Sequence, residues 1–281
     1  MEEFRSFYKR VQGGEGGRCY YPVRLDTYGC GCSHNCKYCY AKSLLDFRKL
    51  WHPESPRVAD INKIIKKVPK LDTVVRIGGM TDCFQECEIE QKVTLRLLLE
   101  LKKYGKHHLI VTKSDLIAED EYIEALNHEL SHIQISLSST DDATAADIEN
   151  APPPSKRIEA IEKLASLGFD VSIRLSPYIP EFVSPEKING IKCNKLLVEF
   201  LRVNTWIKRW LDIDYTKYTL LSGGYRHLEL EDKIQYMKRF TKPEISVCED
   251  VDEHYLYWKE NFNYNKDDCC NLSNVPDSLK G

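Results

Sequence analysis

The sequence predicts an α/β protein whose strands form a parallel sheet. Short runs rich in Val, Ile and Leu alternate with longer helical patterns between residues 20 and 203. About six β/α units can be counted in this stretch, and such alternation is typical of parallel strands joined by crossover helices. The pattern leaves open whether the sheet curves into a barrel, because periodicity carries no information on curvature.

The expected strands are short apolar runs bounded by charged or turn residues. In chain order they cover residues 23–25, 72–77, 108–112, 133–137, 170–175 and 196–200. Longer amphipathic patterns between the strands predict helices at 88–104, 119–130 and 155–167. Gly168 follows the last of these helices in the position of a left-handed cap, which favours glycine.

The pattern changes after residue 203. There we expect a helix at 206–211, a hairpin around 222–224, a helix at 229–240, a strand at 245–247 and a cysteine-bearing tail. We therefore divide the chain into an N-terminal segment (1–19), the β/α unit (20–203) and a C-terminal α+β extension (204–281).

The charge balance excludes a strong global attraction to nucleic acid or to anionic membranes. The chain has 40 basic and 43 acidic side chains, a formal net charge of -3. Its apolar runs are far shorter than the roughly 20 residues of a membrane-spanning helix, and its first residues lack the order of a secretory signal. We expect a cytoplasmic monomer that does not associate with a membrane.

Three of the eleven cysteines predict a metal site. In a reducing compartment, clustered thiols hold metal more often than they form disulfides. Cys32, Cys36 and Cys39 have the spacing C-x3-C-x2-C, shortly after the first expected strand. Three thiolates can bind three irons of a [4Fe-4S] cluster and leave the fourth iron open for a non-protein ligand.

Two other readings of this loop stay open from the residues alone. The three thiols together with Cys30 or His34 could bind zinc, which favours four nitrogen or sulfur ligands, although paired C-x2-C knuckles are absent. A cluster that only transfers electrons is the other reading, and such clusters more often have four cysteines.

The cysteine loop, with Tyr38 between its second and third cysteines, resembles the signature of the radical S-adenosylmethionine (SAM) superfamily. Further matches resemble the spore photoproduct lyase family and follow in the same order along roughly residues 20 to 180. They are the run 32–40, Thr81–Asp82, and residues 111–113, 135–136 and 156–160. The resemblance implies a partial (βα)6 barrel of the TIM type, with the cluster on Cys32, Cys36 and Cys39 and SAM across the carboxyl ends of the strands.

The resemblance also implies a set of residues that bind SAM. Tyr38 and Tyr40 would pack near the adenosine, and Gly78 and Gly79 would bring backbone close to the methionine amine. The polar members of the set are Thr81, Lys113, Ser136 and Arg174, of which Arg174 could pair with the methionine carboxylate. Each polar side chain could instead satisfy backbone or solvent.

The chain departs from the lyase at its hydrogen donor. The lyase family carries a donor cysteine three residues before the aspartate that matches Asp82, and this position is Gly79 here. Cys83 is a candidate catalytic thiol from a shifted position, with a buried inert thiol as the more ordinary reading. Cys87, four residues later, could pair with it.

The C-terminal tail contains candidate ligands for a second iron–sulfur cluster. They are Cys248, which follows an expected strand, and the adjacent pair Cys269 and Cys270. Three thiols could hold an auxiliary cluster with one open site, while structural or zinc-bound thiols are the alternative. Cys19 and Cys193 are further candidates, and nothing in the sequence selects between them.

Two features beyond residue 203 admit a nucleic-acid role or a structural one. Trp206 and Trp210 alternate with basic residues, as in a surface on which bases stack, but their spacing equally suits a helix packed on the sheet. The hairpin with Arg226 and His227 could contact a DNA lesion or simply cap the fold.

The sequence thus predicts an enzyme that cleaves SAM reductively and abstracts hydrogen from an organic substrate. Family analogy favours a pyrimidine or modified thymine in DNA, in a lyase-type or isomerase-type reaction. A small-molecule or peptide substrate with a second cluster is the alternative, and a non-enzymatic iron–sulfur or zinc module is a third reading. The expected partner is an electron donor such as flavodoxin or ferredoxin.

Overall fold

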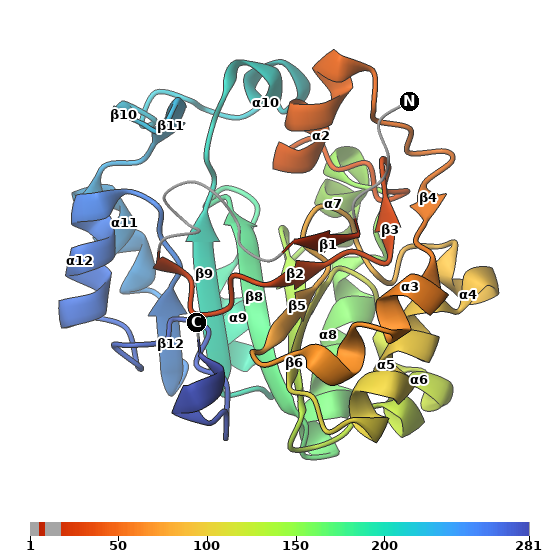
Figure 1. Cartoon of the computed structure of the whole chain (residues 1–281). Coiled ribbons are helices and arrows are strands. Elements are labelled where there is room, and N and C mark those ends of the chain that lie inside the picture. Colours follow the sequence, from red (N-terminus) through yellow and green to blue (C-terminus); the bar gives the residue numbers. More distant parts are fainter. Residues whose placement is uncertain (1–5, 9–17, 281) are drawn as a thin grey trace.

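The central feature of the fold is a mostly parallel sheet. The computed structural model describes residues 6–8 and 18–280 of the chain (Figure 1). Within these residues the main sheet has eight strands, and all neighbours pair in parallel except β1 with β2. In spatial order the strands are β1 (Phe7–Tyr8), β2 (Arg24–Leu25), β5 (Val75–Ile77), β6 (His108–Thr112), β7 (Ser131–Leu137), β8 (Asp170–Tyr178), β9 (Lys195–Phe200) and β12 (Glu244–Val247). The expected α/β class with a parallel sheet is confirmed.

The remaining elements connect and cover these strands. The helices are α2 (Tyr40–Leu45), α3 (Ile61–Ile65), α4 (Glu88–Gln91), α5 (Val93–Lys103), α6 (Asp120–Ala125), α7 (Asp142–Ile148), α8 (Pro154–Ser166), α9 (Pro185–Gly190), α10 (Thr205–Trp210), α11 (Leu230–Met237) and α12 (Asp252–Asn261). Two short hairpins pair β3 (Tyr28–Gly29) with β4 (Arg57–Val58), and β10 (Leu220–Ser222) with β11 (Tyr225–His227). Gly168 ends α8 with φ +85°, as its position in the sequence predicts.

The helix expected at 88–104 is broken into α4 and α5. Lys92 between them has a left-handed φ of 50°. The physical reason is the buried carboxylate of Glu88, which accepts hydrogen bonds from the backbone N–H groups of Thr94 and Leu95, both at 2.9 Å. Glu88 thereby caps the first turn of α5 and stabilises a new helix start where the apolar pattern alone predicts continuity.

The two faces of the sheet are covered by different parts of the chain. Side chains such as Ile77 and Ile110 share one buried apolar cluster with Leu97 of α5 and Ile161 of α8. The opposite face carries a second cluster, in which residues from β6 and β9 pack against Tyr21 and the C-terminal tail. Figure 1 shows this tail ending beside the segment that leads into β2.

The sheet continues past the expected boundary at residue 203. Strand β12 pairs in parallel with β9, so part of the stretch 204–281 belongs to the same sheet as the β/α unit. Most of the expected N-terminal segment (1–19) lies outside the described residues. None of the helices within residues 6–8 and 18–280 combines the length and apolar character needed to cross a membrane.

Candidate active site

The three cysteines of the C-x3-C-x2-C loop lie on consecutive tight turns between β3 and α2. The backbone N–H of Asn35 donates to the carbonyl of Cys32 at 3.1 Å, and that of Cys39 donates to the carbonyl of Cys36 at 3.2 Å. Cys39 is also the N-cap of α2, and its sulfur accepts from the Lys42 N–H at 3.4 Å. The loop is therefore folded by its own backbone and by the start of a helix.

All three thiols line one cavity at the carboxyl ends of the strands. The cavity has a volume of about 1030 Å³, which includes the part that is open to solvent. The thiols are free, and burial raises the pKa of Cys32 to about 12 and the pKa of Cys36 well above its usual value. Burial also raises the pKa of Cys39. Binding of a metal here would release protons, because a metal-bound thiol is deprotonated.

The donor set fits a cluster with one open iron better than a closed zinc site. Cys30 does not line the cavity, so it does not supply a fourth thiol to the site. The Nδ1 atom of His34 lies 3.5 Å from a carboxylate oxygen of Asp82, which engages that side of the ring. A buried polar atom on the cavity wall, Arg174 Nε, has no hydrogen-bond partner among the described residues. The three thiols could hold a cluster, and the unpaired Arg174 Nε could donate to a polar ligand in the same cavity.

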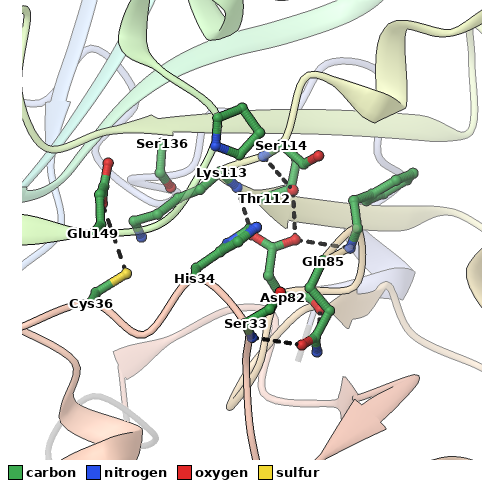
Figure 2. Close-up of polar contacts among 12 residues, drawn as sticks. Ser33, His34, Cys36, Asp82, Gln85, Thr112, Lys113, Ser114, Ser136 and Glu149 are labelled. Atoms are coloured by element: carbon green, nitrogen blue, oxygen red, sulfur yellow. Dashed lines mark hydrogen bonds and ion pairs between the residues drawn. The ribbon is translucent and has the colours of Figure 1, made fainter. Parts of the chain in front are cut away.

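Asp82 holds the cysteine loop against β6 (Figure 2). Its carboxylate accepts from the Thr112 hydroxyl at 2.7 Å and from the Lys113 N–H at 2.6 Å, and it faces His34. Burial alone would raise the pKa of Asp82, but His34 and the hydrogen bonds together lower it to about 2. Asp82, one of the residues that match the lyase family, thus links the cysteine loop to the end of β6.

A second buried carboxylate, Glu149, lies beside the cysteine loop, and sequence reasoning missed this residue. The Cys36 thiol lies 3.8 Å from Glu149 Oε2, and Ser138 donates to the same oxygen at 2.8 Å. The Arg157 guanidinium pairs with Glu149, and both side chains are fully buried. Glu149 is 113 residues from Cys36 in the chain, so no local spacing could have predicted this contact.

The two tyrosines and two glycines expected at SAM all line the cavity. The Tyr38 hydroxyl donates to Ser138 at 2.8 Å, and the Tyr40 hydroxyl donates to the Gly79 carbonyl. Gly78 has φ +85°, and a Cβ there would lie 2.4 Å from the carbonyl oxygen of Val111. Gly78 is therefore required by the backbone of the sheet itself.

The four expected polar side chains also line the cavity, but they differ in how many hydrogen bonds and ion pairs they already make within the protein. The Thr81 hydroxyl donates to the Tyr28 carbonyl at 2.5 Å, which is the ordinary backbone-satisfying role. Ser136 is buried on β7. Lys113 lies with its ammonium 5.5 Å from the centre of the Tyr38 ring, close enough for a cation–π contact.

Arg174 is largely committed to protein partners. Its guanidinium donates to Gln134 at 2.7 Å and to Glu199 at 2.5 Å, and the side chain is 2% exposed. Burial opposes the charge of Arg174, but Glu199 raises its pKa above the usual range, and the pKa of Glu199 falls to about 2. The expected pairing of Arg174 with a methionine carboxylate would have to compete with this buried ion pair.

Cys83, the candidate catalytic thiol, is placed behind the cavity wall. It is 1% exposed, does not line the cavity, and lies next to Gly78. Burial raises its pKa well above the usual value. Its position matches the ordinary reading of a buried small side chain.

The tail cysteines come together, and they are joined by a fourth thiol. Cys248, Cys269 and Cys270 pack in one apolar cluster, and Cys269 interacts electrostatically with both of the others. Cys19 is packed in the same cluster. Cys193, the other thiol left open by the sequence, lies elsewhere and donates to the Val171 carbonyl at 3.2 Å.

Helix α10 and the β10–β11 hairpin lie above the carboxyl ends of β8 and β9 (Figure 1). Of the α10 side chains, Ile207 is buried and lines the cavity, whereas Trp206 and Trp210 are half-buried. The expected hairpin is present, and backbone bonds of 2.9 and 2.8 Å tie Val203 to Arg226. Helix α10 thus contributes to the cavity wall through Ile207, whereas no residue of the β10–β11 hairpin lines the cavity.

The chain is similar in sequence to three proteins that are described as uncharacterized. One protein of Methanocaldococcus jannaschii is 27% identical over 69% of this chain and 77% of its own length. Others are a protein of the Acidianus two-tailed virus (25% identical, 55% of each chain) and one of Mycobacterium tuberculosis (25%, 57% of this chain and 51% of that one). The chain matches only about half the length of the viral and mycobacterial relatives.

Solved structures with the same fold include spore photoproduct lyase and SuiB of Streptococcus suis. A lyase variant with bound SAM and dinucleoside spore photoproduct has a TM-score of 0.59 and 17% identity, covering 82% of this chain and 76% of that one. SuiB bound to its precursor peptide SuiA has a TM-score of 0.52 and 15% identity, covering 78% and 45%. These likenesses confirm the partial TIM-type barrel.

The family model that matches is that of the radical SAM superfamily, over residues 27–183. This range includes the cysteine loop and strands β5 to β8, and it spans more than half of the chain. The resemblance inferred from the cysteine loop is thereby confirmed, and the chain belongs to the radical SAM superfamily.

Proposed function

We propose that this enzyme cleaves SAM reductively at a [4Fe-4S] cluster held by Cys32, Cys36 and Cys39. The observation that carries the proposal is that these three free thiols face one cavity at the carboxyl ends of the parallel strands. When bound, the cluster and SAM together supply a 5′-deoxyadenosyl radical, which abstracts hydrogen from an organic substrate.

The residues around the cavity would bind and orient SAM. Tyr40 and Asp26 fix the backbone at Gly79, since Tyr40 donates to its carbonyl and Asp26 accepts from its N–H at 2.7 Å. Tyr38 would pack against the adenosine. Lys113 is better placed than Arg174 to pair with the methionine carboxylate, because its ammonium has no carboxylate partner among the described residues and faces the cluster thiols.

For the substrate, we propose a pyrimidine or modified thymine in DNA, in a lyase-type or isomerase-type reaction. The cavity combines aromatic side chains such as Trp51 and Phe200 with the cation of Arg202, a combination that suits a nucleotide. A structural neighbour is described with a bound dinucleoside spore photoproduct. Gly79 stands where the lyase family keeps its donor cysteine, so the product radical would be quenched by a different group here.

A second candidate is a small-molecule or peptide substrate. It is favoured by the thiol cluster of the tail, and another neighbour, SuiB, is described with a precursor peptide. For either substrate we propose a one-electron donor such as flavodoxin or ferredoxin as the partner, and a monomeric enzyme of the cytoplasm.

Deuterium transfer tests the substrate proposal. The reconstituted protein is incubated with SAM, a strong reductant and oligonucleotides that carry methyl-deuterated thymine or its photoproduct, and the 5′-deoxyadenosine is analysed by mass spectrometry. Deuterium in the 5′-deoxyadenosine supports a thymine substrate. Abundant 5′-deoxyadenosine without deuterium from any of these oligonucleotides would instead favour the second candidate.

A further inference from the structure

Four thiols from three distant parts of the chain lie together on the face of the sheet opposite α5 and α8. They belong to Cys19, Cys248, Cys269 and Cys270, and none of them is in a disulfide. All four residues pack in one apolar cluster, and Cys19 and Cys269 each interact electrostatically with Cys248 and Cys270. The sequence suggests the last three as ligands, and the structure selects Cys19 rather than Cys193 as the fourth.

The backbone that carries these thiols is anchored segment by segment. Cys248 directly follows β12, and its N–H donates to the Val198 carbonyl of β9 at 2.8 Å. Near Cys19, the Tyr21 hydroxyl donates to Asp268 at 2.5 Å. Asp268 in turn accepts from the Cys270 N–H at 3.0 Å, so one carboxylate links both cysteine segments.

The tail that carries Cys269 and Cys270 is also tied to the floor of the sheet. The Lys195 ammonium donates to the Asn271 carbonyl and to the Ser273 hydroxyl, both at 2.7 Å, and pairs with Asp170 at 2.6 Å. The four thiols are therefore held together by contacts that do not involve the thiols. Such a preformed arrangement is what a metal centre requires of its surroundings.

The environment of the thiols combines an apolar shell with nearby cations. Side chains including Val74, Leu109 and Leu197 pack with them in one apolar cluster. On the side of the SAM cavity, the cations of Arg76 and Arg174 act on Cys270. These two arginines also line the SAM cavity, so the same side chains lie near both the tail thiols and the cavity. Nearby cations offset the negative charge that four thiolates bring to a cluster.

We propose that Cys19, Cys248, Cys269 and Cys270 bind a second [4Fe-4S] cluster beneath the SAM cavity. Four thiolates occupy all four irons, so this cluster has no open site for SAM or substrate. Zinc is disfavoured because its thiol sites typically use spaced C-x2–4-C pairs, whereas two of these ligands are consecutive. The inference rests on the proposed function in one respect, since the expected total of iron includes the four irons of the cluster at Cys32, Cys36 and Cys39.

The test counts iron, sulfide and zinc in the full-length protein after anaerobic reconstitution. We expect about eight irons and eight sulfides per chain, and no zinc. Replacing Cys269 and Cys270 together with Ala should leave about four irons, and so should replacing Cys32, Cys36 and Cys39 together. The matched control is Cys193→Ala, another buried cysteine, which should keep about eight. Circular dichroism verifies that each variant is folded.

Spectroscopy separates the two centres. In the variant that lacks Cys32, Cys36 and Cys39, the remaining reduced cluster should give a paramagnetic resonance spectrum that does not change when SAM is added. Cys19→Ala in that background should lose the spectrum or convert it to a three-iron type.

The second-cluster proposal is overturned by any of three results. These are about four irons in the wild type that persist after removal of Cys269 and Cys270, stoichiometric zinc in place of iron, or thiol titration that shows these cysteines as disulfides. Failure of the proposed function looks different: iron unchanged by loss of Cys32, Cys36 and Cys39, but lost with Cys269 and Cys270.

Discussion

The Tyr21 hydroxyl donates a hydrogen bond of 2.5 Å to Asp268, and this contact joins residues 247 positions apart. Both side chains are almost fully buried, and they connect the entry into β2 with the C-terminal tail. The pairing places Cys19 beside Cys269 and Cys270, because each of these cysteines lies within two residues of the bonded pair.

Removing this hydroxyl should destabilise the fold and the thiol cluster together. Tyr21→Phe removes the shorter of two hydrogen bonds to a buried carboxylate oxygen, which keeps only the Leu272 N–H at 3.2 Å, and we expect a loss of about 2 kcal/mol in the free energy of unfolding. Denaturant titration of the metal-free protein measures this loss. The control is Tyr264→Phe, at a tyrosine that is 61% exposed, where we expect almost no change. Equal stabilities of the two variants would contradict the linking role of Tyr21.

Gly78 should be far less tolerant of a side chain than Gly168, although both have φ +85°. A Cβ at Gly78 would lie 2.4 Å from the Val111 carbonyl oxygen, whereas nothing lies within 4 Å of one at Gly168. We expect Gly168→Ala to cost about 1 kcal/mol from backbone strain, and Gly78→Ala to cost about 2 kcal/mol more. Thermal unfolding of the two variants measures the difference, and equal melting temperatures would rule out a close approach at Gly78.

Asp26 should make stability fall between pH 4 and pH 6. Burial raises its pKa from 3.8 to about 6, although the N–H groups of Met80 and Gly79 favour the charged form. The folded state then binds a proton more tightly than the unfolded state, so stability is greatest below pH 4 and declines until about pH 6.

The matched variant is Asp26→Asn, which cannot ionise. Relative to this variant, the wild type should lose on the order of 2–3 kcal/mol between pH 4 and pH 7. Urea unfolding of both metal-free proteins at several pH values measures this change. A difference between the two proteins that stays constant with pH would show that Asp26 is ionised as readily in the folded state as in the unfolded chain.

Arg226, exposed on the β10–β11 hairpin, should contribute to binding of DNA if the substrate is a thymine in DNA. Arg226→Ala should weaken oligonucleotide binding several-fold and reduce the salt dependence of the affinity by about one counterion. The control is Lys66→Ala, an exposed lysine beside α3, far from α10 in Figure 1. Fluorescence anisotropy at several salt concentrations makes the comparison. Identical effects of both substitutions would argue against a DNA-binding hairpin.

Much of the fold could be predicted because its strands and helices have locally readable patterns. The strand at 108–112 matches β6 residue for residue, since His108 is followed by four consecutive apolar or β-branched residues and then by Lys113. The break between α4 and α5 could not be predicted, because it depends on the buried carboxylate of Glu88 reaching the N–H groups of Thr94 and Leu95.

The site divides in the same way. Cys32, Cys36 and Cys39 lie on one loop, so their spacing alone indicates a shared ligand. Glu149 beside Cys36, and Cys19 beside Cys270, come together only through the tertiary fold, and no spacing in the sequence reports such contacts.

The most direct test of the central claim is formation of 5′-deoxyadenosine by the anaerobically reconstituted protein with SAM and dithionite. We predict that the wild type forms it, that Cys36→Ala abolishes it, and that Cys87→Ala, at a half-buried cysteine that does not line the cavity, leaves it unchanged. No 5′-deoxyadenosine from the iron-loaded wild type, or equal amounts from the wild type and Cys36→Ala, would contradict the account.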